Sequence, residues 1–483
     1  MRKILLLLAL SLSLYASAQT GITWNMGMNI AASNFGSMHP RMVIDGMGNP
    51  VVIFGRMSDQ SVFISRWNGT AFTMPMQINP VSLTVATMSW QGPDIVSKGD
   101  TIYVVMKQTP EADTSSHVYI QSSFDAGATF SQPLRVDNIA DSISRFPTVT
   151  IDDNGNPIVA FMKMDASFMN ARWVVTRSND FGNTFSIDQL ASGWSGGLIC
   201  DCCPGALANS GNNLLMLYRD NLNNLRDMWA GISTDNGNTF TGGMPIDQNN
   251  WMISACPSSG PDGVIIGDTL YSTFMSSASG SSLVYSSSSS ISSMAGSIGN
   301  PITGSFGGLS TQNYPRLATD GTAMAIGWKQ NVNGSDQFAL IFTNDVANGF
   351  FGTYDTVDMS NITNVDVAIA NGNVYTVWQD DGSGTVKFRS GTFNVTTGYN
   401  TLRGNGIVSC FPNPAKEIIT VKSSSAENRL ITITNVLGNS ILIDNIPAGG
   451  LKILNTADWE NGVYFITSTS QKSVSNQKII IQH

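Results

Sequence analysis

Short runs of apolar residues, broken at close intervals by Gly, Asn, Asp, Ser and Pro, follow one another along almost the whole chain. Runs such as residues 51–54 (Val-Val-Ile-Phe) and 418–421 (Ile-Ile-Thr-Val) have the length and the β-branched composition of strands. The residues between the runs are those that form tight turns. No helical period of useful length accompanies them, so the pattern predicts an all-β protein.

A motif of eight residues occurs three times as a near copy, with the pattern Ser-x-Asp-x-Gly-x-Thr-Phe. The copies span residues 123–130, 178–185 and 233–240, and their aspartates are spaced 55 residues apart: Asp125, Asp180 and Asp235. The pattern suits a tight hairpin, because Asp bonds to its own turn backbone, Gly supplies a positive φ and Phe anchors the next strand inward. We therefore assign the three aspartates a structural role.

A second repeated unit, two apolar strands joined by a turn, begins in most cases at a proline. Its prolines are 53 to 57 residues apart, and a related unit without proline begins at residue 364: Pro40, Pro93, Pro147, Pro204, Pro261 and Pro315. A unit of about fifty residues with three to four short strands cannot bury its faces alone, whereas a closed ring of such units buries all of them. The spacing predicts a β-propeller over residues 20–400 with seven blades, or alternatively six. An outer strand from residues 21–25 would close the ring.

The eight-residue motifs resemble the Asp-box (BNR) repeats of the sialidase superfamily, and the resemblance extends over about residues 37–395. It implies a sialidase-like propeller. It does not imply the activity, because function depends on a site and not on the fold that carries it.

The same resemblance sets out what a sialidase would need: three arginines for the substrate carboxylate, a tyrosine nucleophile with a glutamate partner, and an aspartate as acid and base. Arg41, Arg145 and Arg316 occupy equivalent positions at the start of three units. Between residues 19 and 400 the only glutamate is Glu111. A glycoside hydrolase of the exo-sialidase type is therefore kept as the alternative, and no catalytic residue is assigned.

Propeller ligands bind at one end of the central channel, close to the strands that begin each unit. The arginines and aspartate near these positions are the candidate binding residues for an anionic or sugar ligand: Arg145, Arg219, Arg226, Asp227 and Arg316. Arginine suits this role because its planar group matches a carboxylate with two parallel hydrogen bonds. The pattern favours a secreted or cell-surface protein that engages extracellular glycans or other polymers.

Cysteines are concentrated in the segment Cys200-Asp201-Cys202-Cys203, with Cys256 at the start of the next unit. Equivalent positions in neighbouring blades lie at the same edge, so these four thiols are expected to lie close together. Two disulfides are the expected outcome in an exported protein, and a bond from Cys256 to Cys200 or Cys202 would join two blades. The fifth cysteine, Cys410, lies in the tail and is expected to be unpaired.

The alternative for this cluster is a thiolate site for copper or zinc, since soft sulfur ligands select such ions. Three Met-x-Met pairs give this reading slight support, although methionine is also a common filler of irregular cores. No cofactor is otherwise indicated.

The two ends of the chain carry export signals. Residues 1–18 combine a basic start (Arg2, Lys3), an apolar run over residues 4–14 and the small residues Ala16-Ser17-Ala18, which is the pattern of a secretory signal peptide. The apolar run is shorter than the ~20 residues that span a bilayer, so no transmembrane span is predicted.

The last eighty or so residues change character and predict about seven short strands, the pattern of a small β-sandwich. The segments FPNPAKE, NVLGNSI, ENGVYFI and KIIIQ within residues 405–483 resemble the sorting domain of type IX secretion cargo of Bacteroidetes. This resemblance implies passage through the periplasm, contact with the type IX machinery, and release or display at the outer-membrane surface.

Composition narrows the remaining choices. Only 12% of the residues are charged and the net charge is −9, with lysines and arginines scattered singly, so neither nucleic acid nor an anionic membrane is expected as a partner. With histidine only at positions 39, 117 and 483, a zinc site built from several histidines or a Ser-His-Asp triad is hard to assemble.

Overall fold

The computed structural model describes residues 21–350, 353–394, 408–425, 427–470 and 474–483. The predicted signal peptide, residues 1–18, lies outside these ranges. Within them strands are the main regular structure, and the one helical element is the short 3-10 turn Val346–Asn348. No helix in the described ranges is long and apolar enough to cross a bilayer. The chain divides into two compact units, Met1–Val395 and Thr396–His483.

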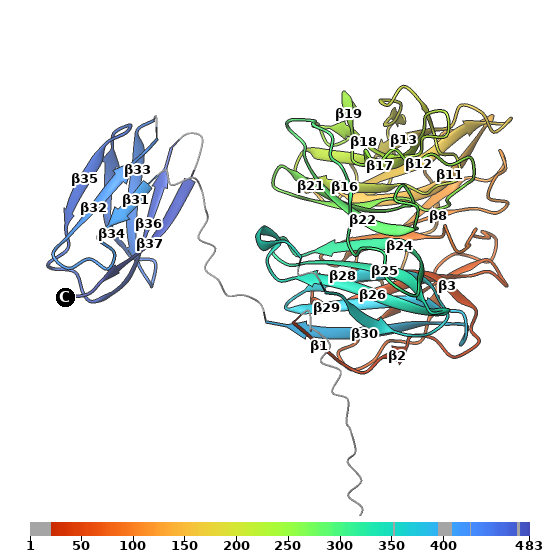
Figure 1. The fold of residues 1–483 in the computed structure, drawn as a ribbon, viewed down its shortest axis with the longest axis horizontal. Helices are drawn as coiled ribbons and strands as arrows, with labels where there is room; N and C mark the ends of the chain where they lie inside the picture. The colour runs from red at the N-terminus through yellow and green to blue at the C-terminus, as the bar shows by residue number, and fades with distance from the viewer. Residues whose placement is uncertain (1–20, 351–352, 395–407, 426, 471–473) are drawn as a thin grey trace, which may run out of the picture. The chain divides into compact units, whose positions relative to one another are not determined.

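The first unit contains seven antiparallel sheets of four or five strands, which follow one another along the chain (Figure 1). The first three sheets are formed by β3 (Ser37–Ile44), β4 (Pro50–Arg56), β5 (Ser61–Arg66) and β6 (Met76–Gln77); by β7 (Asp94–Lys98), β8 (Thr101–Lys107), β9 (Val118–Ser123) and β10 (Leu134–Arg135); and by β11 (Ser142–Ile151), β12 (Pro157–Asp165), β13 (Arg172–Arg177) and β14 (Gln189–Leu190).

The fourth and fifth sheets are formed by β15 (Leu198–Ile199), β16 (Ala206–Ser210), β17 (Asn213–Asn221), β18 (Met228–Ser233) and β19 (Gly242–Pro245); and by β20 (Asp262–Ile266), β21 (Thr269–Ser276), β22 (Leu283–Ser290) and β23 (Asn300–Pro301). The sixth consists of β24 (Leu309–Thr319), β25 (Met324–Val332), β26 (Ser335–Thr343) and β27 (Asp355–Asp358). The seventh combines β28 (Ile362–Ala370), β29 (Asn373–Asp380) and β30 (Thr385–Phe393) with β1 (Ile22–Trp24) and β2 (Met28–Asn29) from the other end of the unit.

The sheets are arranged in a closed circle. Strands β3, β7, β11, β16, β20, β24 and β28 contact one another in this order, and β28 contacts β3. The seam lies within the seventh sheet, where β1 pairs with β30 in the register Ile22 to Phe393. The expected outer strand at residues 21–25 is thereby confirmed.

The hydrophobic core is divided among the interfaces between neighbouring sheets. Val159 and Phe161 of the third sheet pack with Tyr103 of the second, and Phe54 of the first packs with Phe388 of the seventh. Each of the seven interfaces has its own cluster of buried apolar side chains. A single sheet would leave its apolar faces exposed to water. Closure of the circle buries both faces of every sheet.

The three Ser-x-Asp-x-Gly-x-Thr-Phe segments, called the Asp turns below, adopt the same structure. In the second, Asp180 Oδ1 accepts hydrogen bonds from the Thr184 N–H at 2.9 Å and the Ser178 hydroxyl at 2.7 Å, and Asp180 Oδ2 accepts from the Thr184 hydroxyl at 2.6 Å. Gly182 has φ +86°, a conformation that favours glycine. Phe185 packs into the interface between the second and third sheets. The turn geometry expected from the motif is thus present.

The low-complexity polar composition of residues 276–293 predicts a loop-rich fifth blade, whereas the structure has a regular strand in this stretch. Within it, Leu283–Ser290 form β22, which pairs with β21 over eight residues. The serines that face the interior bond to one another and to the main chain: Ser272 Oγ lies 2.7 Å from Ser287 Oγ, which donates to the Ile246 carbonyl at 2.8 Å. Satisfied hydroxyls allow serine to occupy a buried strand.

The second unit contains two antiparallel sheets. One is formed by β31 (Val408–Phe411), β32 (Ile418–Ser423) and β35 (Leu451–Asn455), and the other by β33 (Arg429–Asn435), β34 (Ser440–Ile446), β36 (Gly462–Thr469) and β37 (Val474–Ile481). Residues of both sheets, such as Ile419 and Ile433, share one buried cluster, which also contains Cys410.

Candidate functional site

A cavity of about 160 Å³ lies at the centre of the circle, and every one of the seven sheets contributes to its wall. Its polar and aromatic lining residues include His39, Arg41, Trp90, Gln91, Asp94, Phe146, Asp262, Tyr314, Arg316 and Asn364. We call it the central cavity. Convergence of polar groups from many elements on one concave space is the usual form of a small-molecule site.

An irregularity repeated in three sheets brings side chains into this cavity. The residue before the first proline has a positive φ in β3, β11 and β24: 51° at His39, 50° at Phe146 and 52° at Tyr314. At each place the pairing with the next strand shifts, as in a β-bulge. A positive φ is unfavourable for bulky residues and persists only where the surrounding structure imposes it, as it often does at functional sites. The bulge re-aims one large ring per sheet toward the cavity.

The charged groups of the central cavity are balanced. Arg316 Nε lies 3.0 Å from Asp366 Oδ1 and 3.4 Å from Asp262 Oδ2, and these carboxylates help to raise the pKa of Arg316 despite its burial. Burial and the neighbouring Arg316 lower the pKa of Arg41 to about 10. Burial also holds the pKa of His39 well below its usual value, so the imidazole is neutral at pH 7 while both guanidinium groups are charged.

The predicted ligand residues do not meet at one site. Of the five predicted ligand residues, only Arg316 lines the central cavity. Arg145 Nε bonds to Glu111 Oε1 at 2.7 Å, which engages the glutamate that a sialidase mechanism would require. Neither Arg145 nor Glu111 is among the residues that line the cavity.

Two further arginines are bound to the main chain. The buried Arg219 donates three hydrogen bonds to the carbonyls of Ser259, Arg226 and Met275 at 3.2, 2.8 and 2.8 Å, so it joins the fourth and fifth sheets. Arg226 donates to the Ile253 carbonyl at 3.1 Å and, through Nη1, to Cys200 Sγ at 2.9 Å.

Asp227 lies at a different cavity, of about 430 Å³, beside the fourth sheet. Its carboxylate accepts hydrogen bonds from the N–H groups of Asn250 and Trp251 at 3.1 and 3.0 Å. Asp220 and Asp247 line the same cavity, and burial raises the pKa of each to about 6. Asp247 Oδ2 is buried without a hydrogen-bond partner. The sequence contained no signal that would have singled out Asp247.

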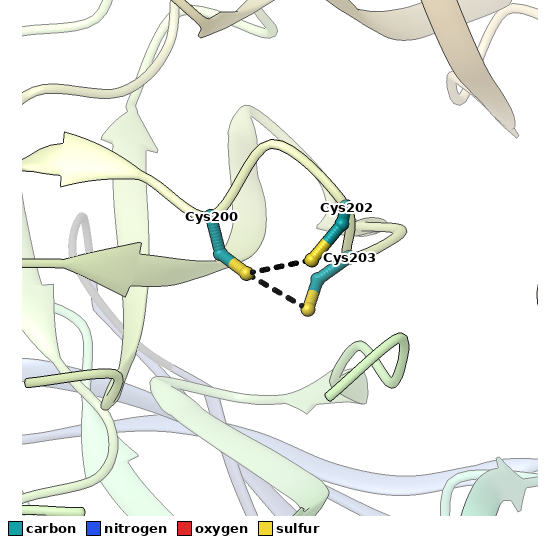
Figure 2. Close-up of side chains that lie close together, drawn as sticks. All are labelled: Cys200, Cys202 and Cys203. Carbon is teal, nitrogen blue, oxygen red and sulfur yellow. Dashed lines mark hydrogen bonds between the residues drawn. The ribbon is translucent and has the colours of Figure 1, made fainter. Parts of the chain in front are cut away.

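The four cysteines 200, 202, 203 and 256 come together at the start of the fourth sheet, and we call them the cysteine cluster. Cys202 and Cys256 form a disulfide that joins segments 54 residues apart. Cys200 and Cys203 are buried free thiols, so the structure has one disulfide in the cluster where two were expected. Figure 2 shows Cys200 Sγ pointing at its two neighbours, 3.1 Å from Cys203 Sγ and 3.4 Å from Cys202 Sγ.

The thiols of the cluster differ in their electrostatic surroundings. The Cys203 thiol, Arg226 and Arg219 lower the pKa of Cys200 below that of an ordinary thiol. Burial and the neighbouring Cys200 raise the pKa of Cys203. The two directions differ, so the thiolate form is favoured at Cys200 over Cys203.

The cysteine cluster offers sulfur ligands for a metal ion, but few of its thiols are free. The sulfur atoms of Cys200, Cys202 and Cys203 lie within 4.8 Å of one another. With the Cys202–Cys256 bond in place only two thiols are free, whereas a structural zinc site uses four ligands. The cluster borders the central cavity, since Pro204, which follows Cys203, lines that cavity together with Ser259.

The positions of the cavity rings were marked in the sequence by the repeated residue-proline pairs, although the rings themselves were not singled out as binding residues. Trp90, Gln91 and Asn364, which complete the polar wall, stand at equivalent unit starts without any distinguishing motif.

Comparison with known proteins identifies the tail. Residues 409–482 match the family model described as a secretion system C-terminal sorting domain, which confirms the interpretation of this segment and indicates export. No curated protein matches the chain.

Solved structures match the fold at low similarity. A protein of unknown function from Dyadobacter fermentans DSM 18053 is 13% identical, with a TM-score of 0.44 over 65% of this chain and 95% of that one. A polysaccharide lyase of family PL25, an ulvan lyase, is 11% identical, with a TM-score of 0.45 over 76% and 94% of the two chains. Trypanosoma rangeli sialidase is 10% identical, with a TM-score of 0.44 over 92% and 84%. At these values none of them assigns an activity to this chain.

Proposed function

We propose that this chain is an exported seven-bladed β-propeller that binds a sugar unit of an extracellular glycan in its central cavity, without cleaving it. In this proposal the propeller corresponds to residues 20–400, and the Asp turns are Asp-boxes. Residues 405–483 form a β-sandwich that the type IX machinery recognises, with release or display at the cell surface. The circle of contacts that returns from β28 to β3 supports the seven-bladed count.

The composition of the cavity wall is the observation that best supports a sugar as the ligand. Three rings, Phe146, Trp90 and Tyr314, stand with the amides of Gln91 and Asn364 around one small space. Aromatic faces pack against the C–H face of a sugar ring, and amides both donate to and accept from its hydroxyls. Such a wall fits a polyhydroxylated ring better than an apolar ligand.

The charge balance favours a neutral sugar over an anion. Arg316 already has two carboxylate partners, and Asp94 and Asp262 line the same space as the two arginines. A ligand carboxylate would have to compete with these groups for the guanidinium. The small volume favours a single terminal unit of a glycan over an internal segment of a chain.

Calorimetric titration of the mature protein with neutral and acidic oligosaccharides tests this proposal. We expect a neutral ligand to bind and Trp90→Ala to weaken its affinity by about tenfold, because a lost aromatic contact is worth about 1 kcal/mol or more. Trp194→Ala is the matched control, since Trp194 lies outside the cavity wall. Absence of binding, or equal losses in both variants, would contradict the site.

Chromatography of the same mixtures addresses catalysis. Intact oligosaccharide after prolonged incubation is expected. Released monosaccharide would instead establish a glycoside hydrolase, and release of sialic acid would establish the exo-sialidase alternative.

A further inference from the structure

We propose that the cysteine cluster is a thiol–disulfide relay, in which the buried Cys200/Cys203 dithiol exchanges with the Cys202–Cys256 disulfide and the chain thereby reduces a disulfide of an external molecule. The inference is independent of the glycan proposal. It rests on the placement of four sulfur atoms that the sugar-binding cavity does not use.

Burial separates the cluster into an inner and an outer pair. Cys200 and Cys203 are each 1% exposed, whereas Cys256 lies on the surface and Cys202 is half-buried. An external molecule can therefore reach the outer pair and not the inner one. Contact between the pairs is provided by Cys200, which lies within 3.4 Å of Cys202 Sγ.

Exchange requires a thiolate beside a disulfide sulfur. Arg226 Nη1 donates to Cys200 Sγ at 2.9 Å, so a cation is held against the sulfur that must carry negative charge. Arg226 is itself fixed by its bond to the Ile253 carbonyl, in the segment that leads to Cys256. The lowered pKa of Cys200 agrees with this arrangement.

The first step moves the disulfide inward. Cys200 thiolate forms a bond to Cys202 Sγ, the Cys202–Cys256 bond breaks, and Cys256 leaves as an exposed thiolate. In the second step Cys203, 3.1 Å from Cys200 Sγ, forms a bond to that sulfur and expels Cys202, which receives the proton that Cys203 gives up. One disulfide is present throughout, and it ends as Cys200–Cys203.

The outer pair then acts on the external disulfide. Cys256 thiolate attacks one sulfur of the external molecule and releases one thiolate. Cys202 then attacks Cys256 Sγ and releases the second thiolate, which restores the Cys202–Cys256 bond. Two electrons pass from Cys200 and Cys203 to the external disulfide, so that one chain reduces one disulfide.

Labelling of Cys256 in the native, mature protein tests the first step. A maleimide carried on a polyethylene glycol chain, too large to enter the protein, is added under denaturant-free conditions, and the labelled residue is located by peptide mass spectrometry. All samples carry Cys410→Ser, which removes the cysteine of the tail. We expect Cys256 to be labelled, and Cys200→Ser to slow labelling by about tenfold or more.

The matched control is Cys203→Ser, at an equally buried position of the same cluster. It removes the second step only, so Cys256 should still be labelled, and a general loss of folding would affect both variants alike. Wild-type protein without label at Cys256, or equal labelling in wild type and Cys200→Ser, would overturn the relay and establish a static disulfide.

Reduction of dithiodipyridine, followed by the absorbance of the released thiopyridone, tests the activity. We expect two thiopyridone molecules per chain and a new Cys200–Cys203 disulfide in the peptide map. The inner thiols remaining free in the map, with no thiopyridone released, would contradict the activity even if Cys256 were labelled.

Discussion

The Asp turns and the cysteine cluster both depend on short side chains that bond to nearby groups, but they hold charge in opposite ways. In the Asp turns every carboxylate oxygen accepts hydrogen bonds from its own turn, which lowers the pKa of Asp125 and Asp180 to about 2. In the cluster the Cys203 thiol and the distant Arg226 lower the pKa of Cys200, and Cys200 Sγ lies 3.4 Å from a sulfur of the Cys202–Cys256 disulfide. Self-contained groups stabilise a fold, whereas a charge beside a reactive bond can do chemistry.

Removal of the disulfide should have the largest effect on stability. Because the Cys202–Cys256 bond closes a loop of 54 residues, Cys256→Ser should lower the free energy of unfolding by about 4 kcal/mol. Chemical denaturation monitored by tryptophan fluorescence checks this value. An unchanged midpoint would mean that the bond serves reactivity alone, which would make the contrast with the Asp turns sharper.

Removal of one Asp-turn carboxylate should have a smaller effect. Asp235 accepts from the Thr239 N–H at 2.8 Å, from its hydroxyl at 2.6 Å and from the Ser233 hydroxyl at 2.8 Å. Asp235→Ala should cost about 2 kcal/mol, since the groups are partly exposed and water replaces some of the bonds. Asp235→Asn retains one acceptor oxygen and should cost less. An alanine variant as stable as wild type would show that the turn is held by its glycine and phenylalanine.

Burial disfavours the charged form of Asp247. Removing its carboxylate should therefore raise the free energy of unfolding, not lower it. The folded state raises the pKa of Asp247 to about 6, above the unfolded value of about 4, so its cost to stability is absent below pH 4, grows between pH 4 and pH 6 and is complete above pH 6. Asp247→Asn should therefore stabilise the protein by about 1 to 2 kcal/mol at pH 7, with no difference below pH 4. Denaturation midpoints measured from pH 4 to pH 8 check the trend. A parallel profile for the two proteins would contradict it.

Much of the fold could be predicted because it is repeated. The regular spacing of the Asp turns and of the unit prolines marked where the strands of the first unit begin, and the tail matched a sorting domain at several separate points. The serine-rich strand β22 was not predicted, because buried hydroxyls can bond to one another and the composition of a strand does not reveal such pairs.

The candidate site was less predictable, since it depends on where single side chains point. Arg219 and Arg316 were both predicted as ligand residues, yet Arg219 is enclosed by three carbonyl groups and Arg316 lines the cavity. The exact register of the strand and the groups that pack around it decide between these outcomes, and the sequence does not show either of them. The proximity of the four cysteines could be predicted, because they lie at the starts of two neighbouring units and these starts lie at the same edge.

The pairing of β1 with β30 also constrains the order of events during synthesis and export. The first strand of the structure cannot bond to its partner until residues up to Phe393 have followed, so the earliest segment must wait for almost the whole unit. Contacts between such distant segments form slowly. A chain interrupted before β30 retains an unpaired edge at Ile22–Trp24, which is open to other strands and thus to aggregation. Because the sorting segment is synthesised after β30, a chain that presents it already contains the strand that completes the circle.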